Sequence, residues 1–341
     1  MAFDFSADPL ALPAFLPELE ACSSVRSLLA HCFSQSLNLA SVPWIDGPHL
    51  ALRAARSSAD AEVVVPRAGL AMPGRLDPLV RVMLMARELR LAQTLRRDLR
   101  CQFADEEPRD PGVLKLDAPT GRARPVDGVI PDPYCLGSRG YLLFRQAYAS
   151  APPPAWRQRR PVAIWRGATT GSHAITPRRL PQNLRYRLCA HSLRWPDRLD
   201  ARFTSVVQCR DGEAQQAVTA ELVRLGLMAP VLEPLQMAQC RWIVDIDGNV
   251  NSWGLLWKLL SGSCVLRVSS DRGQWFHHRL RPGHHLVLIR SDLADLEQQL
   301  DWCWANPASC EAIAAAGQRL ALEVLEDLGV DLLSALRWSL G

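Results

Sequence analysis

The sequence predicts an α/β protein whose C-terminal half is built around a parallel β-sheet. From residue 162 onward, short apolar runs alternate with amphipathic segments of helical length, which is typical of βαβ units. Turn-forming residues separate the runs, and the loops after them contain glycine and good helix caps. With 341 residues, 48% hydrophobic and 22% charged, the chain has the composition of a globular protein with two domains of ordinary size.

The spacing of apolar residues predicts the individual elements. The predicted strands are 61–66, 162–165, 203–208, 242–246, 264–268 and 285–289. The predicted helices are 13–40, 50–56, 78–99, 139–149, 183–192, 213–225, 253–260, 272–280, 292–305, 307–328 and 332–340. Helical segments between successive strands of the second half imply a parallel sheet with right-handed crossovers.

The proline-rich stretch at 151–160, APPPAWRQRR, is the best candidate for a linker between domains. It separates an N-terminal domain at 1–150 from a C-terminal domain at 161–325. We expect the final segment, 326–341, to form a helix that packs back on the N-terminal domain.

The net charge, the cysteine spacing and the lengths of the apolar runs argue against several classes of protein. A net charge of +4 and the lack of a recognised module argue against nucleic-acid binding. The ten cysteines form no CxxC pair, so neither a zinc site nor a thioredoxin-like motif is indicated. The first residues carry acids and no early Lys or Arg, unlike a signal peptide, and no apolar run approaches the ~20 residues of a membrane span. We therefore expect a cytoplasmic protein, and leave peripheral contact with a membrane open.

Two loops stand where ligands bind in open α/β sheets, after the carboxyl ends of strands. The first is Trp165-Arg166-Gly167-Ala168-Thr169-Thr170-Gly171, rich in backbone N–H groups and hydroxyls. The second runs from Asp247-Gly248 through Asn251 to Ser252, which is predicted to cap a helix starting at Trp253. Such loops can hold an anion such as a nucleotide diphosphate. Equally, the loops could be ordinary connections between strand and helix that bind no ligand, with caps that bond only the N–H groups of their own helix. Trp165 would then belong to the core, and Arg166 would be solvated or ion-paired.

The Asp245-Ile246-Asp247 sequence admits another interpretation. Two carboxylates at this spacing after a strand can share one divalent cation with a diphosphate. So short a match is weak evidence, and without a metal the first carboxylate simply ends a strand while the second forms a turn.

A series of short motifs follows in a definite order and spacing along the second half of the chain. They are WRG at 165–167, the arginine-bearing helix at 185–187, QCRW at 239–242, DG at 247–248, SW at 252–253, LLSGS at 259–263, WF at 275–276 and LRPGHH at 280–285. This series resembles glycosyltransferase family 90, which includes Rumi-type protein O-glucosyl- and O-xylosyltransferases and bacterial lipopolysaccharide-modifying enzymes. The resemblance covers roughly residues 128–325.

The resemblance implies a GT-B architecture, with two Rossmann-like domains facing a cleft, and inverting transfer from a UDP-sugar without a metal or other cofactor. Residues implied to bind the donor are Trp165, Arg166, Gly167, Thr169, Thr170, Gly171, Arg185, Arg241, Asp247, Gly248, Asn251, Ser252 and Trp253. A glycan or lipopolysaccharide hydroxyl would be the acceptor.

Two departures from the Rumi-type pattern bear on the mechanism. Those members carry Ser-x-Arg where this chain has Ser252-Trp253-Gly254, and Arg241, Lys258 or Arg267 could compensate for the missing arginine. Their catalytic Asp lies in an R-D-Y sequence, where this chain has Gly140. Inverting transfer still requires a base to deprotonate the acceptor.

Asp132 is our candidate base, and Asp127 and His191 are alternatives. Asp132 could also simply start a proline turn.

The leading hypothesis is a bacterial glycosyltransferase that moves a hexose or pentose from a UDP-sugar to a surface-glycan or lipopolysaccharide acceptor. The missing Asp and Arg leave open a non-catalytic relative that binds glycan or membrane surface. A metal-dependent transferase using Asp245 and Asp247 is the third hypothesis.

Overall fold

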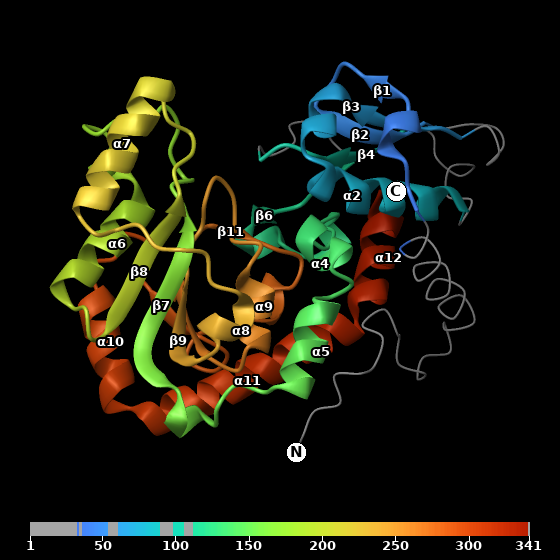
Figure 1. Cartoon of the computed structure of the whole chain (residues 1–341). Coiled ribbons are helices and arrows are strands. Elements are labelled where there is room, and N and C mark those ends of the chain that lie inside the picture. Colours follow the sequence, from blue (N-terminus) through green and yellow to red (C-terminus); the bar gives the residue numbers. More distant parts are fainter. Residues whose placement is uncertain (1–32, 34–35, 54–60, 89–97, 106–111, 340–341) are drawn as a thin grey trace. The chain divides into compact units, whose positions relative to one another are not determined.

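The computed structural model describes residues 33, 36–53, 61–88, 98–105 and 112–339. The chain divides into two compact units (Figure 1). Unit 1 comprises residues 1–146, 271–279 and 323–341, and unit 2 comprises 147–270 and 280–322. The fold is mixed α/β, as the sequence predicts, and parallel strand pairs occur in both units. The domain boundaries and the linker at 151–160 stay predictions.

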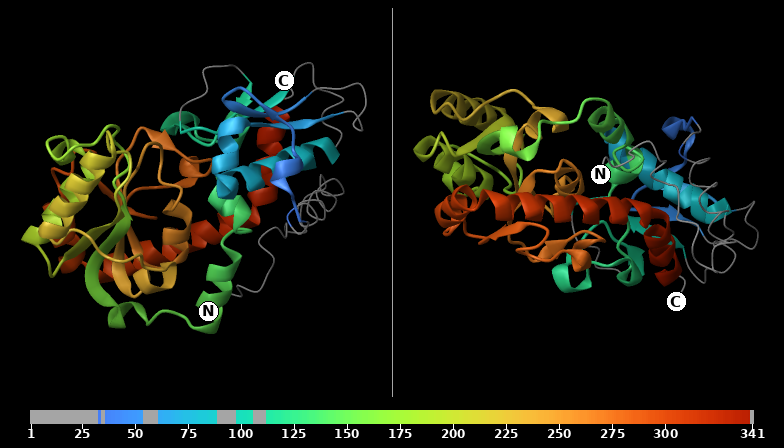
Figure 2. Two further views of the ribbon diagram at one scale, coloured as in Figure 1. Left: turned by 45° about the horizontal axis from the view of Figure 1, so that its top comes forward. Right: turned by 90° about the horizontal axis from the view of Figure 1, so that it is seen from below.

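Unit 2 contains the predicted parallel sheet, in the order β12-β10-β9-β7-β8. Its strands are β7 (Arg160–Ala168), β8 (Leu199–Ser205), β9 (Cys240–Asp245), β10 (Cys264–Val268) and β12 (Val287–Ile289). Its helices are α6 (Leu184–Arg194), α7 (Gly212–Arg224), α8 (Pro234–Met237), α9 (Leu255–Leu260), α10 (Leu296–Ala305) and most of α11 (Pro307–Glu326), with 3-10 turns η5 (Trp156–Gln158) and η6 (Leu180–Gln182). Figure 2 shows the same helices around the sheet from two further sides.

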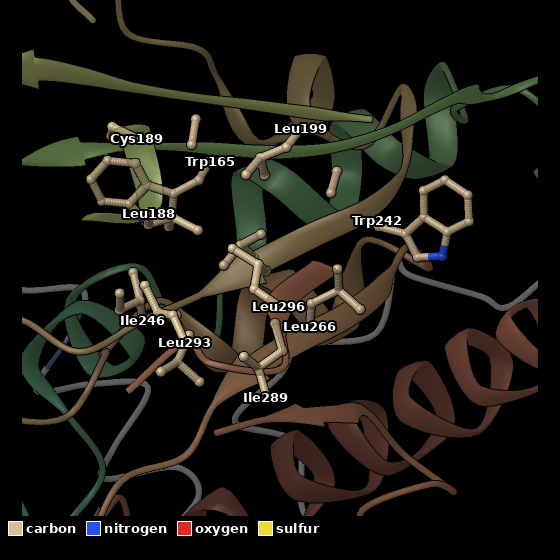
Figure 3. Close-up of a cluster of buried hydrophobic side chains, with 14 of the residues drawn as sticks. Trp165, Leu188, Cys189, Leu199, Trp242, Ile246, Leu266, Ile289, Leu293 and Leu296 are labelled. Atoms are coloured by element: carbon tan, nitrogen blue, oxygen red, sulfur yellow. The ribbon is translucent and has the colours of Figure 1, made fainter. Parts of the chain in front are cut away.

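Alternation along β7 builds a core on each face of this sheet. Ala163 and Trp165 face a large cluster that includes residues of α6, α10 and α11. Val162 and Ile164 face a smaller one with Met237 of α8. In Figure 3 the Trp165 ring lies beside Leu188 and Cys189 of α6. The sheet is therefore buried on both sides, and its strand ends are where polar loops can gather.

Unit 1 is built on a mixed five-stranded sheet in the order β1-β3-β2-β4-β5. Its strands are β1 (Trp44–Ile45), β2 (His49–Leu52), β3 (Val63–Pro66), β4 (Leu99–Gln102) and β5 (Val113–Leu114), with a separate pair, β6 (Ala118–Pro119) and β11 (Arg272–Gly273). Its helices are α2 (Pro73–Glu88), α4 (Pro133–Gly137) and α12 (Leu328–Trp338). The first part of α5 (Leu142–Ser150), up to Gln146, also belongs to unit 1. Short 3-10 turns are η1 (Leu39–Ser41), η2 (Arg67–Ala71), η3 (Thr120–Arg122), η4 (Pro125–Asp127) and η7 (His277–Arg279).

Within unit 1, α2 packs on β2 and β3, and α12 packs on η4. Gly128, directly after η4, has a φ of +80°. A Cβ at this position would overlap the ring of Trp338. Glycine is thus required here both by the left-handed backbone and by the close approach of α12.

Two sequence predictions about single elements are wrong, and a third has the wrong bounds. Residues 50–52 belong to β2, a strand paired on both sides, because tertiary pairing overrides the weak helical spacing. The strand predicted at 203–208 starts at Leu199, because Leu199, Ala201 and Phe203 alternate into the core. In place of a helix over 272–280, Arg272–Gly273 pairs with β6 and η7 follows. The predicted helix 13–40 lies almost wholly outside the described residues, as does the 89–97 part of the predicted helix 78–99.

None of the helices in the described part of the chain combines the length and apolar character that a membrane crossing needs. The cytoplasmic location stays a prediction.

Candidate functional site

The strand order of unit 2 places a topological switch point between β7 and β9. β7 connects to β8 on one side, whereas β9 leads on through β10 to β12 on the other. In open α/β sheets ligands bind at the carboxyl edge where the winding reverses in this way. Both predicted loops start at this point, since one follows β7 and the other follows β9.

The loop after β7 is shaped by two glycines and two threonines. A Cβ at Gly167 would lie 2.6 Å from the Trp165 ring, so only glycine fits beside that buried side chain. The Thr169 hydroxyl bonds the backbone of Val207, at 2.8 Å both to its N–H and to its carbonyl. Gly171 has a φ of +96°, and a Cβ there would lie 3.2 Å from the carbonyl oxygen of Gly248. The two loops therefore touch backbone to backbone.

Arg185, on the first turn of α6, ties these loops together. Its Nε donates to the carbonyl of Asp247 at 2.8 Å, and Nη2 donates to that of Ile246 at 3.2 Å. Its Nη1 donates to the carbonyl of Ala168 at 3.0 Å and to the Thr170 hydroxyl at 2.5 Å. Burial lowers the pKa of Arg185 to about 10 against the opposing charges of Asp247 and Asp245. The guanidinium is still charged at neutral pH, and most of its donors hold backbone rather than point outward.

Further contacts fix the same junction. The N–H of Gly171 donates to the Asn249 side chain at 3.0 Å. A Cβ at Gly248 would lie 2.7 Å from the Thr170 hydroxyl and 3.0 Å from a guanidinium nitrogen of Arg185. Gly248 thus lets the second loop approach the first closely.

Beneath the second loop lies a buried ionic cluster around Asp245. One carboxylate oxygen accepts from Lys258 Nζ and from the Ser252 hydroxyl, each at 2.6 Å. The other accepts from Arg267 at 2.5 Å, and Arg267 also bonds Asp247 at 2.6 Å. Burial alone would raise the pKa of Asp245, but the charges of Lys258 and Arg267 outweigh it and hold that pKa well below its usual value.

The charges of this cluster leave a positive excess. Three cations, Arg185, Lys258 and Arg267, stand against two carboxylates, Asp245 and Asp247. The sequence singles out Lys258 only as a candidate to replace the missing Ser-x-Arg arginine, and nothing in its apolar run LLWKLL indicates an ion pair. A carboxylate already occupied by two cations and a hydroxyl is a poor cation ligand. No group of three or more metal-binding side chains occurs among the described residues.

The prediction that Ser252 caps a helix is wrong. α9 begins at Leu255, and Gly254 precedes it without a side-chain cap. The Ser252 hydroxyl donates to Asp245, and its N–H donates to the side chain of Asp247 at 2.9 Å. Trp253 is buried, with 8% of its surface exposed, and Asn251 with 4%. Hydrogen bonds from Ser252 to Asp245 and Asp247 therefore anchor the polar loop to the buried ionic cluster.

Two predicted residues lie apart from this junction. Arg166 leaves β7 on the face opposite Trp165 and bonds Asp200 of β8, with Nη2 to a carboxylate oxygen at 2.8 Å. Arg241 stands at the amino end of β9 and donates to the carbonyl of Arg157 at 2.7 Å. Of the other eleven residues implied for the donor, Trp165 and Gly167 lie within β7, Arg185 lies on α6, and the remaining eight lie in the two loops.

Asp132 belongs to unit 1, where it is the N-cap of α4. One carboxylate oxygen accepts from the N–H groups of Tyr134 at 2.9 Å and Cys135 at 3.0 Å. The other has no hydrogen-bond partner within the described ranges. Burial raises the pKa of Asp132 to about 7, although the backbone hydrogen bonds act to lower it.

The two alternative bases are occupied elsewhere. Asp127 pairs with Arg124 at 2.8 Å. His191 stacks on Trp195 with ring centroids 5.1 Å apart, and burial lowers its pKa.

The sequence did not lead us to Asn183 as a site residue, although an Asn before a helical run is a typical cap. Its side chain caps α6 through Tyr186 and donates to the carbonyls of Thr169 and Thr170.

The sequence model of glycosyl transferase family 90 matches residues 142–331, more than half of the chain. The chain belongs to this family. It is 32% identical to uncharacterized protein 027R of Frog virus 3 (isolate Goorha) over 185 residues, which cover 50% of this chain and 19% of that protein. It is 34% identical to O-glucosyltransferase LpsA of Dichelobacter nodosus over 82 residues, 24% of this chain and 26% of that protein. The matched region is thus a small part of these relatives.

Among solved structures, this family member is similar to Anabaena Alr3699/HepE in complex with UDP-glucose. The two are 13% identical, with a TM-score of 0.35, over 56% of this chain and 51% of that chain. A score this low does not assign a common fold.

Proposed function

We propose that this family 90 member transfers a hexose or pentose from a UDP-sugar to a hydroxyl of a lipopolysaccharide or other surface glycan, with inversion at the anomeric carbon. The observation that carries the proposal is the junction of the β7 and β9 loops at the switch point of the sheet, tied by Arg185 over a cluster with a positive excess. A diphosphate leaving group bears negative charge, which such a site stabilises. We extend the proposal to a GT-B arrangement, with the acceptor bound by unit 1.

The chemistry that this requires is simple to state. A base takes the proton of the acceptor hydroxyl, the oxygen bonds to the anomeric carbon, and the bond from that carbon to UDP breaks. We assign the base to Asp132, because one of its oxygens is unpartnered in the described part of the chain and a pKa of about 7 suits a base near neutral pH. We propose no metal, since Lys258, Arg267 and Ser252 already hold Asp245.

The test follows UDP release with a panel of UDP-sugars and glycan acceptors, and the anomeric configuration of the product by NMR. Thr170→Val removes the hydroxyl that accepts from Arg185 at 2.5 Å while keeping the shape of the side chain. We expect the KM for the donor to rise about tenfold, the equivalent of one hydrogen bond to a charged group. Arg241→Ala, at the amino end of β9, is the matched control and should leave that KM unchanged.

A folded protein that neither binds nor turns over any UDP-sugar would disprove the proposal. Full activity in excess chelator is expected, and loss of activity that Mg²⁺ or Mn²⁺ restores would favour the metal-dependent alternative.

The N-cap role of Asp132 favours a second candidate, a non-catalytic relative that binds glycan or membrane surface. Asp132→Asn separates the two, because Asn also caps a helix but cannot act as a base. The transferase should lose turnover while its affinity for UDP stays the same. Unchanged turnover would mean that Asp132 serves only α4.

A further inference from the structure

Asn251 stands out in the loop between β9 and α9 because its buried side chain finds no hydrogen-bond partner among the described residues. Only 4% of its surface is exposed. Neither Oδ1 nor Nδ2 has a partner among the residues that the structure describes. Asn183, on the same edge of the sheet, is the opposite case. It is 1% exposed, and its Nδ2 donates to three acceptors while its Oδ1 accepts from the N–H of Tyr186.

The neighbours of Asn251 make its isolation informative. Ser252 is bonded to Asp245 and Asp247, and Gly248 bonds the carbonyl of Val250. The polar groups of Val250 and Ser252, on either side of Asn251, therefore have hydrogen-bond partners in the loop, whereas the side-chain amide of Asn251 has none among the described residues. A buried amide without partners costs stability, so a native protein that keeps one commonly completes it with water or a ligand.

The two atoms define the ligand chemistry. Nδ2 needs an acceptor, and Oδ1 needs a donor. An ionised diphosphate offers acceptors only, so it could satisfy one atom and not the other. Two parts of a nucleotide sugar both donate and accept, the transferred sugar and the nucleoside. The nucleoside stays with the diphosphate when the sugar is transferred, so its place in the site is the same for the donor and for product UDP. Binding of UDP, which has no sugar to transfer, therefore tests the nucleoside directly.

We propose that Asn251 recognises the nucleoside of the donor and sets the specificity for it. This inference rests on the proposed function. The matching group is either the imide edge of the base, with its N–H and carbonyl, or the ribose hydroxyls, which also donate and accept. Both sources present the same hydrogen-bonding chemistry to the amide.

The experiment uses Asn251→Leu, an apolar side chain of similar shape, with Asn251→Ala as a second variant should the larger side chain not fit. Binding of UDP, CDP and 2′-deoxy-UDP is measured by titration calorimetry, and thermal unfolding by scanning calorimetry. We expect the Kd for UDP to rise at least tenfold, while the Tm stays level or rises because an unsatisfied amide is removed. Asn183→Leu is the matched control, and its Tm should fall.

The nucleotide arms identify the source. If the wild type prefers UDP to CDP and the variant loses that preference, Asn251 binds the base. If it prefers UDP to 2′-deoxy-UDP and the variant loses that preference, Asn251 binds the ribose. Either result supports the proposal.

Three outcomes would overturn it. Equal affinity of wild type and variants for UDP would show that Asn251 does not touch the nucleoside, although the transferase proposal would survive. A Tm that falls as far as in Asn183→Leu would mean that a structural water completes the amide. A wild type that binds no UDP would refute the proposed function and this inference together.

Discussion

Asp245 of unit 2 and Asp132 of unit 1 are both completely buried carboxyl groups, yet their surroundings give them opposite properties. Asp245 has Lys258 and Arg267 within 2.6 Å, and these charges hold its pKa down. Within the described part of the chain, only backbone N–H groups donate to Asp132, and burial raises its pKa to about 7. Charge neutralisation, not depth, therefore decides whether a buried carboxyl group stays ionised.

The contrast has a consequence for stability at different pH. The folded pKa of Asp245 is below the unfolded value, so its contribution is present above about pH 4 and is lost as the pH falls through the folded pKa. The folded pKa of Asp132 is above the unfolded value, so its contribution is present below about pH 4 and is lost as the pH rises toward about 7. Replacing Asp by Asn at matched positions tests both signs.

The largest effect is expected from Asp245→Asn. The variant leaves Lys258 buried, at 7% exposure, without its carboxylate partner, and leaves Arg267, at 4% exposure, with Asp247 alone. Breaking a buried ion pair on one side costs about 3–5 kcal/mol. We expect a loss of unfolding free energy of that order in urea at pH 7, followed by circular dichroism.

A double variant, Asp245→Asn with Lys258→Met, is the control for this prediction. Removing a cation together with the carboxylate should recover part of the loss, because fewer buried charges remain unpaired. A single variant that loses less than about 1 kcal/mol would mean that water reaches the cluster, and the contrast with Asp132 would fail.

The next effect concerns pH and Asp132→Asn. Between about pH 4 and 7 the folded wild type binds a proton at Asp132 that the unfolded chain does not, so the wild type should lose stability relative to the variant as the pH rises. The slope cannot exceed about 1.4 kcal/mol per pH unit for one group. Urea unfolding of both proteins at several pH values measures this slope. Other carboxyl groups with raised pKa values, such as Asp331, are present in both proteins, so their contributions cancel in the difference between the two unfolding free energies.

Asn keeps the N-cap of α4, so Asp132→Ala supplies the control for capping. Neither Asn nor Ala ionises, and their difference should be about 1 kcal/mol at every pH. Parallel pH curves for wild type and Asp132→Asn would show that Asp132 is ionised in the folded protein, in spite of its burial.

How far the sequence predicts these features depends on whether they are local. The strands and helices of unit 2 are largely confirmed because apolar periodicity and caps such as those of α6 and α7 are local signals. The meeting of the β7 and β9 loops could be anticipated from the rule for strand ends. The ion pairs of Lys258 and Arg267 could not, since partners 13 and 22 residues away in the chain leave no pattern in the sequence.

Unit 1 was predicted less well for a related reason. Its strands are two to four residues long and pair across distant segments, so β2 carries no alternation that distinguishes it from a helical turn. The role of Ser252 was missed because the same residue type suits a cap and a bond to a buried carboxylate. The sequence context of Arg166 is compatible with a ligand or with an ion partner, and the pairing with Asp200 on the next strand could not be read from it.

The smallest effect is expected from Asp127→Asn in unit 1. Asp127 also pairs with an arginine, but its side chain is 27% exposed and that of Arg124 is 45% exposed. Solvent screens such a pair, so its removal should leave the unfolding midpoint unchanged within error in the same urea experiment. Turnover should also stay at the wild-type rate, because Asp127, an alternative to Asp132 as the base, is held in the ion pair with Arg124. A loss of stability comparable to that of Asp245→Asn would mean that ion pairing, and not burial, sets how much a carboxylate contributes to the free energy of unfolding. The contrast between the two buried carboxyl groups would then need another cause.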